Sequence, residues 1–97
     1  MNNPPKKLIK EKIYVKVTAG FDATGYMQPN AIIWDDGRVF PIDKVRDFRP
    51  AGTLAGTVGD CYTVLIHGQE KHLFFERTDP LFQGRCGRWF VENISGE

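Results

Sequence analysis

Apolar and polar positions alternate with a period of two in the first regular stretch of the chain. From Ile13 to Phe21 every second residue is apolar, and apart from Tyr14 the residues between them are polar or small. This spacing is typical of a β-strand with one buried face, because successive side chains of a strand point to opposite sides of a sheet. The sequence therefore predicts a half-buried strand over residues 13–21.

A turn signal separates the next two apolar segments. Residues 31–34 read Ala-Ile-Ile-Trp, and an Asp-Gly pair at 36–37 leads to Val-Phe at 39–40. We expect a type I′ hairpin here, since both central residues of that turn need positive φ and Asp-Gly provides them. Pro41 has no N–H to donate, so the second strand ends there or lies at an edge.

The apolar positions after this hairpin are spaced irregularly. Ile42, Val45 and Phe48 recur every three residues, which fits neither a regular strand nor a long helix. We interpret this segment as a bent strand or a β-bulge. Residues 50–60 hold three glycines and no charge before the last position, which indicates a loop.

The second half of the chain predicts another hairpin and a closing strand. Residues 61–66 and 71–76 have strand patterns, and His-Gly-Gln-Glu at 67–70 turns the chain between them. Asp-Pro-Leu-Phe at 79–82 is typical of a single helical turn, because aspartate caps and proline begins helices. Residues 88–92 form the last predicted strand.

Six or seven short strands without a long helix predict an all-β protein. We expect a small antiparallel SH3-like barrel or roll, because so small a sheet must curl to cover its one apolar face and to protect its edges. The expected organisation is a flexible basic arm over residues 1–11, a single β-barrel domain over 12–94 and a frayed tail over 95–97.

The composition is that of one folded domain. The chain has 97 residues, of which 41% are hydrophobic and 26% are charged, which is unlike a disordered chain. Its formal net charge of +1 excludes the strongly basic class of nucleic-acid binders. The sequence shows no secretory signal and no apolar run of membrane length, so we expect a cytoplasmic protein.

Two cysteines and two histidines are candidate residues for covalent or metal chemistry. We expect Cys61 and Cys86 to be free thiols, one of them packed inside, because two cysteines are too few for a disulfide scaffold. No catalytic signature surrounds either cysteine, and the spacing of both cysteines with His67 and His72 does not match a zinc knuckle. We therefore expect no enzymatic activity, no metal and no cofactor.

Positive charge and aromatic residues give the one suggestive pattern. Residues 1–20 hold five lysines and one glutamate, which indicates either a contact with an anionic partner or a solubilising tail, and we favour the tail. Arginines also stand close to large rings, as in platforms that stack bases, but in so small a domain we favour a core role for the rings. The groups are Trp34 with Arg38, Phe48 with Arg46 and Arg49, and Trp89 with Arg88.

Two segments carry a resemblance to known sequences. Residues 34–45 read Trp-Asp-Asp-Gly-Arg-Val-Phe-Pro-Ile-Asp-Lys-Val, and residues 87–92 read Gly-Arg-Trp-Phe-Val-Glu. The chain resembles a group of short, uncharacterised bacterial all-β proteins that share this hairpin and this closing strand. The resemblance would cover most of residues 13–92, and it implies a compact β domain of bacterial, cytoplasmic origin. It brings no activity and no site residues, and Pro41, inside the hairpin strand, is the first position to check for a departure from the group.

Binding is the function class that these observations favour. We expect a non-enzymatic interaction module that contacts a protein partner, or a second copy of itself, through an edge strand. The alternative is weak nucleic-acid binding by the basic arm and an aromatic–arginine face, which salt would weaken steeply. The candidate binding residues are Lys6, Lys7, Lys10, Lys12, Lys16, Arg38, Arg46, Arg49 and Arg88.

Overall fold

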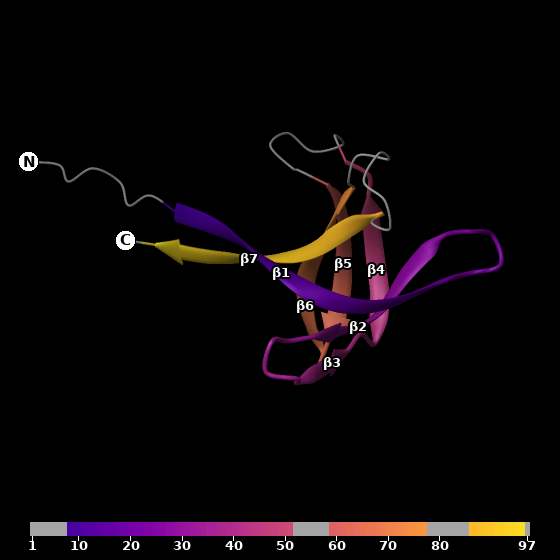
Figure 1. The fold of residues 1–97 in the computed structure, drawn as a ribbon, viewed down its shortest axis with the longest axis horizontal. Helices are drawn as coiled ribbons and strands as arrows, with labels where there is room; N and C mark the ends of the chain where they lie inside the picture. The colour runs from indigo at the N-terminus through magenta and orange to yellow at the C-terminus, as the bar shows by residue number, and fades with distance from the viewer. Residues whose placement is uncertain (1–7, 52–58, 78–85, 97) are drawn as a thin grey trace, which may run out of the picture.

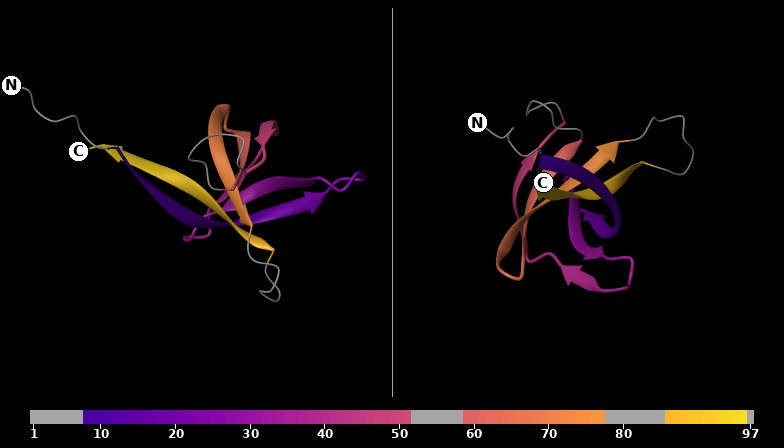
Figure 2. Two further views of the ribbon diagram at one scale, coloured as in Figure 1. Left: turned by 90° about the horizontal axis from the view of Figure 1, so that it is seen from above. Right: turned by 90° about the vertical axis from the view of Figure 1, so that its left-hand side faces the viewer.

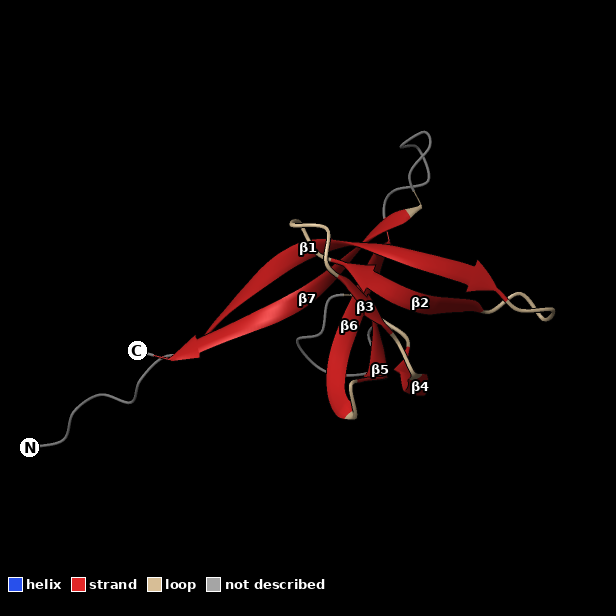
Figure 3. Cartoon of the chain, turned by 90° about the horizontal axis from the view of Figure 1, so that it is seen from below, coloured by secondary structure: helices blue, strands red, loops and turns tan. Residues whose placement is uncertain are grey.

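The protein is all-β, as its sequence predicts. The computed structural model describes residues 8–51, 59–77 and 86–96, and these residues form seven strands and no helix (Figures 1 and 3). All pairs are antiparallel, in the order β3-β2-β1-β7-β6-β5-β4, and the sheet curls into a half barrel consistent with a small SH3-like barrel or roll (Figure 2). The strands are β1 (Leu8–Phe21), β2 (Met27–Ile33), β3 (Val39–Pro41), β4 (Lys44–Arg49), β5 (Asp60–Ile66), β6 (Gln69–Arg77) and β7 (Gly87–Gly96).

The long strand β1 belongs to both halves of the sheet. Its residues 8–15 pair with β7, and its residues 16–21 pair with β2 on the other side. The register with β2 shifts between Thr18 and Ala19, which increases the local bend. As a result the β1–β7 ribbon leaves the barrel on one side and the β1–β2 hairpin leaves it on the other (Figure 1).

The predicted hairpin of β2 and β3 is confirmed, with Ile33 opposite Val39, but the predicted turn type is wrong. Within this turn only Gly37 has a positive φ (89°). Its N–H donates to Trp34 O at 2.9 Å, so residues 35–37 form a three-residue loop. A left-handed glycine after a type I turn accounts for this geometry. The two-residue turn with both φ values positive lies instead at His67 and Gly68, between β5 and β6.

The irregular segment after β3 joins the two ends of the sheet. Ile42 N–H donates to Asn30 O of β2, and Asp43 N–H donates to Leu65 O of β5, both at 2.8 Å. In β4 the register with β5 then shifts between Val45 and Asp47, which confirms the predicted bulge. The extra residue brings side chains three apart in sequence onto one face of the sheet.

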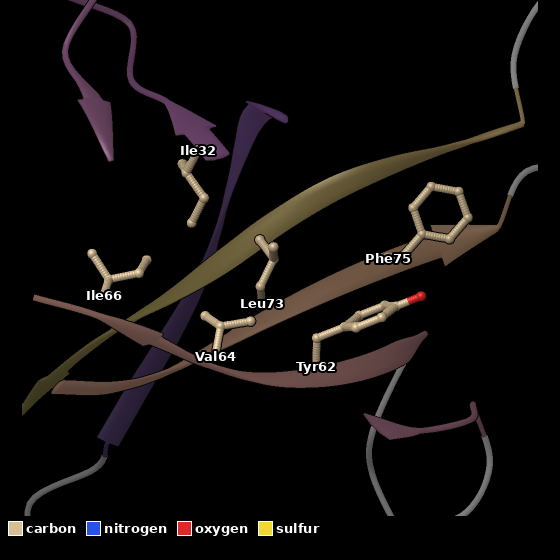
Figure 4. Close-up of a cluster of buried hydrophobic side chains, with 6 residues drawn as sticks. All are labelled: Ile32, Tyr62, Val64, Ile66, Leu73 and Phe75. Atoms are coloured by element: carbon tan, nitrogen blue, oxygen red, sulfur yellow. The ribbon is translucent and has the colours of Figure 1, made fainter. Parts of the chain in front are cut away.

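Alternate residues of β5 and β6 fill the concave face of the half barrel (Figure 4). Val64 and Leu73 are fully buried at its centre. Trp34 and Trp89 are half-buried and pack against this cluster, which supports the core role expected for both rings. The buried cluster consists of Ile32, Tyr62, Val64, Ile66, Leu73 and Phe75.

The ends of the chain differ from the predicted boundaries. β1 begins at Leu8, inside the predicted arm, and β7 runs to Gly96, inside the predicted tail. Leu8 lies opposite Gly96. Main-chain hydrogen bonds can pair two strands whose side chains do not alternate between apolar and polar, so the sequence pattern does not reveal this part of the ribbon. The helical turn predicted at 79–82 lies outside the described residues. Within the described part of the chain, no helix is long and apolar enough to cross a membrane.

Candidate functional site

The structure brings only some of the predicted binding residues together. Lys6 and Lys7 lie outside the described residues, and Lys10 is placed only by its backbone in β1. Arg38 pairs with Asp36 and Arg49 pairs with Asp47, each within its own turn or strand. Lys16 and Arg46 are exposed.

Lys12 and Arg88 meet at one carboxylate on the outer face of the sheet. Lys12 Nζ lies 2.7 Å from Glu76 Oε1, Arg88 Nη2 lies 2.9 Å from Oε2, and the Tyr14 hydroxyl donates to Oε2 at 3.1 Å. The hydrogen bond from Lys12 lowers the pKa of Glu76, the bonds from Arg88 and Tyr14 lower it further, and Glu76 in turn raises the pKa of Lys12. The Arg88 guanidinium also stacks 4.0 Å from the centre of the Tyr14 ring. This basic cluster is therefore partly neutralised.

The three large rings beside arginines do not form a stacking platform. Trp89 packs in the core against Phe75 and Tyr62, with ring centres 4.8 and 5.4 Å apart. Trp34 packs against the core at the start of the β2–β3 loop. Phe48 is 39% exposed and lies against Tyr62, so it is the one ring of the three that reaches solvent to a large extent.

One of the two thiols lies in contact with one of the two imidazoles. Cys61 is buried and Cys86 is exposed, in agreement with the prediction of one packed thiol. Cys61 Sγ lies 3.7 Å from His72 Nδ1, but burial raises the pKa of the Cys61 thiol, which disfavours a thiolate nucleophile. His67 packs against Phe40 instead. Among residues 8–51, 59–77 and 86–96, no three potential ligands gather to hold a metal ion.

An apolar groove that the sequence did not indicate lies between the β1–β2 hairpin and the barrel. Its volume is ≈ 880 Å³, and its walls come from the turn end of the hairpin, from β4, β5 and β6, and from Cys86 just before β7. Two of its rings are the most exposed of the large hydrophobic side chains described, Phe21 at 75% and Tyr26 at 66%. We call it the aromatic groove and define it by Phe21, Tyr26, Met27, Phe48 and Tyr62.

Asp22 fixes the hairpin end that carries the two exposed rings. Its Oδ1 accepts hydrogen bonds from the Thr24 N–H at 2.9 Å, the Thr24 hydroxyl at 2.7 Å and the Tyr26 N–H at 3.0 Å. Gly25 closes the loop with φ of 92°, a conformation that glycine adopts without strain. Phe21 and Tyr26 are therefore exposed on an ordered turn.

The inner end of the aromatic groove is polar and fully hydrogen-bonded. The Tyr62 hydroxyl donates to Met27 O at 3.3 Å, which ties β5 to the hairpin across the floor. Asp60 is buried, accepts from Ala51 N–H at 2.9 Å and pairs with Arg77 at 3.2 Å. Arg77 thus places a largely exposed cation at the edge of an otherwise apolar surface.

The alternation that reveals β1 also conceals this groove. Phe21 occupies the next alternate position after the apolar residues from Ile13 to Ala19, so the sequence pattern assigns its side chain to the core. It lies instead on the part of β1 that has left the barrel. The available signal was Tyr26, an aromatic residue next to the turn glycine Gly25, where a buried ring is not expected.

Comparison of the chain with models of protein families, with curated proteins and with solved structures finds no match.

Proposed function

We propose that the protein is a non-enzymatic interaction module whose aromatic groove binds an extended segment of another protein. The observation that carries this proposal is the position of Phe21 and Tyr26, two exposed rings on an ordered turn beside an apolar groove. Large apolar side chains rarely gather on a surface that stays in water, and such patches mark binding sites.

The chemistry of the groove favours a peptide segment as its occupant. The few residues that dominate the binding energy of protein interfaces are enriched in tyrosine, tryptophan and arginine, and side chains that are already held in place lose little conformational entropy on binding. The groove is mostly apolar, and the largely exposed side chains of Arg77 and Tyr26 lie at its edge, where they can hydrogen-bond a peptide carbonyl. An extended segment with apolar side chains therefore matches its shape and polarity.

The non-enzymatic part of the proposal has its own support. The one cysteine in contact with a histidine, Cys61, is buried, and its pKa is raised. A nucleophilic thiol needs the opposite environment, exposed and electropositive. In the aromatic groove, the Asp60 carboxylate is already engaged by Arg77 and by the Ala51 amide. The exposed thiol of Cys86 also lines the groove, but no histidine is among the described residues that line it.

Selection of peptides from a random display library tests the groove. Recovered peptides are titrated against the wild type, Phe21→Ser, Tyr26→Ser and the control Val39→Ser. Val39 is also an exposed apolar residue, but it lies on β3, outside the groove. We expect each groove variant to weaken binding by about tenfold or more, as for a central interface residue, and the control to bind like the wild type. If no peptide is enriched, or if both groove variants keep full affinity, the proposal is wrong.

Nucleic-acid binding is the second candidate, and one observation favours it. Lys16 and Arg88 line a shallow depression of ≈ 330 Å³ beside the exposed ring of Tyr14, and Lys12 lies one alternate position along β1. Cations around an exposed ring suit a single strand, with a base on the ring and phosphates on the cations. Glu76 opposes this function, because it already pairs with Lys12 and Arg88.

Filter binding to single- and double-stranded oligonucleotides tests the second candidate. If it holds, affinity falls steeply between low and moderate salt as counterions are released, and Lys16→Ala weakens binding. Peptide binding in the apolar groove responds little to the same change of salt. No retention of oligonucleotide at low salt would eliminate nucleic-acid binding.

A further inference from the structure

The β1–β7 ribbon has an open strand edge on β1. Residues 8–15 of β1 pair with β7 on one side, and β2 occupies the other side only from Lys16 onward. In the described part of the chain nothing pairs with residues 8–15 on that second side, and the ribbon stands away from the barrel (Figures 1 and 3). A row of backbone N–H and C=O groups is therefore open for an additional strand.

The outer part of this ribbon is only two strands wide. β6 pairs with β7 from Gly87 to Phe90, so within the described part of the chain residues 91–96 of β7 and residues 8–13 of β1 have only each other as strand partners. Two-stranded ribbons are marginally stable in water, and a third strand stabilises them. An added strand would thus gain hydrogen bonds and order the ribbon at the same time.

The charges on β1 determine which strand fits. Lys10 and Lys12 occupy alternate positions on one face, on either side of Glu11. If two copies of this edge paired antiparallel around Glu11, each Lys10 would lie opposite a Lys12 and the two glutamates opposite each other. Pairing around either lysine would place that lysine opposite itself. Like charges directly opposite destabilise a sheet, so a second copy fits poorly.

We propose that the open edge of β1 binds an acidic β-strand of a partner protein. A strand with aspartate or glutamate at alternate positions would place one carboxylate opposite Lys10 and another opposite Lys12, whose ammonium group it would share with Glu76. The backbone of the added strand would pair with residues 8–15. Lysine on an exposed edge also discourages self-association, and the same charges that exclude a second copy attract an acidic strand.

Amide hydrogen exchange by NMR on the full chain tests this proposal. The probe is a peptide of alternating glutamate and valine, as long as the open edge, and the control peptide alternates lysine and valine. We expect the acidic peptide to slow exchange at alternate amides of residues 8–15, those that do not bond to β7, and the control peptide to slow none. Higher salt should weaken the binding, because the opposed charges are exposed.

A matched pair of charge reversals separates strand addition from general attraction. Lys10→Glu lies on the open edge, whereas Lys16→Glu makes the same charge change opposite Ile33, where β2 already occupies the edge. We expect Lys10→Glu to lower the affinity for the acidic peptide about fivefold and Lys16→Glu to change this affinity little. Thermal unfolding of both variants confirms that they remain folded.

Three results would overturn the proposal. The first is binding of the acidic peptide without protection of β1 amides, and the second is equal loss of affinity in both charge reversals. The third is a dimer of the free protein in light scattering with the β1 amides already protected, which would assign the edge to a second copy. Phe21→Ser, which disables the aromatic groove, should leave the edge intact, so failure of one proposal is distinguishable from failure of the other.

Discussion

Replacement of Trp89 by alanine tests whether the core of this small domain depends on its rings. Trp89 lies opposite Val15 of β1 and Phe75 of β6, so it joins both neighbours of β7. Its ring centre is 4.8 Å from Phe75 and 5.4 Å from Tyr62. Alanine would leave a void where the two halves of the sheet meet.

The cost of this void can be worked from the packing. Removal of a fully buried tryptophan costs about 3–5 kcal/mol. Trp89 is half-buried, which favours the lower end, but it also loses two ring contacts of about 0.5–1.5 kcal/mol each. We therefore expect Trp89→Ala to lower the free energy of unfolding by about 3 kcal/mol, or the melting temperature by roughly 15 °C.

Denaturant unfolding followed by Trp34 fluorescence and by circular dichroism measures this loss. The midpoint should fall while the denaturant dependence stays unchanged, as for a loss of packing alone. Val39→Ala is the control, because Val39 is exposed on β3, and it should change stability by less than about 0.5 kcal/mol. A loss below about 1 kcal/mol for Trp89→Ala would refute the core role of this ring.

Other predictions concern charge, close packing and thiol access. The lowered pKa of Glu76 means that its ionised form stabilises the fold, so the wild type should be more stable than Glu76→Gln at neutral pH. This difference in stability should disappear as the pH falls through the pKa of Glu76 in the folded state, and urea unfolding across the acid range measures it. Gly87→Ala should destabilise the protein strongly in thermal unfolding, because its Cβ would lie 2.5 Å from backbone and ring atoms, whereas Gly20→Ala meets nothing closer than 3.7 Å. Mass spectrometry after brief alkylation should show Cys86 modified in the folded state and Cys61 only after unfolding.

Local patterns in the sequence predict most of the fold. The alternation in residues 13–21 reveals β1, and the spacing of Val45 and Phe48 reveals the bulge of β4, because both are properties of neighbouring residues. The turn at 35–37 was predicted with the wrong type, since Asp-Gly serves both as a two-residue turn and as the end of a longer one. Pairing of Leu8 with Gly96 depends on residues at opposite ends of the chain, and no local pattern contains it.

The candidate sites were less predictable for the same reason. Lys12 and Arg88 were both predicted as binding residues, but only the pairing of β1, β7 and β6 shows that they share Glu76. Phe21 occupies an alternate position that the pattern predicts to be buried, but its side chain is exposed because this end of β1 has left the barrel. Which surface a side chain faces is therefore decided by the path of the sheet, which is a property of the whole chain.

The central place of β1 in the sheet has a consequence for synthesis on the ribosome. β1 emerges first and can form a hairpin with β2 early, but its other neighbour, β7, emerges last. Contacts between such distant segments form slowly, because the long intervening chain must be ordered before they are gained. The half barrel can therefore form completely only after β7 has been synthesised, and until then its unpaired strands are exposed to aggregation or to capture by chaperones.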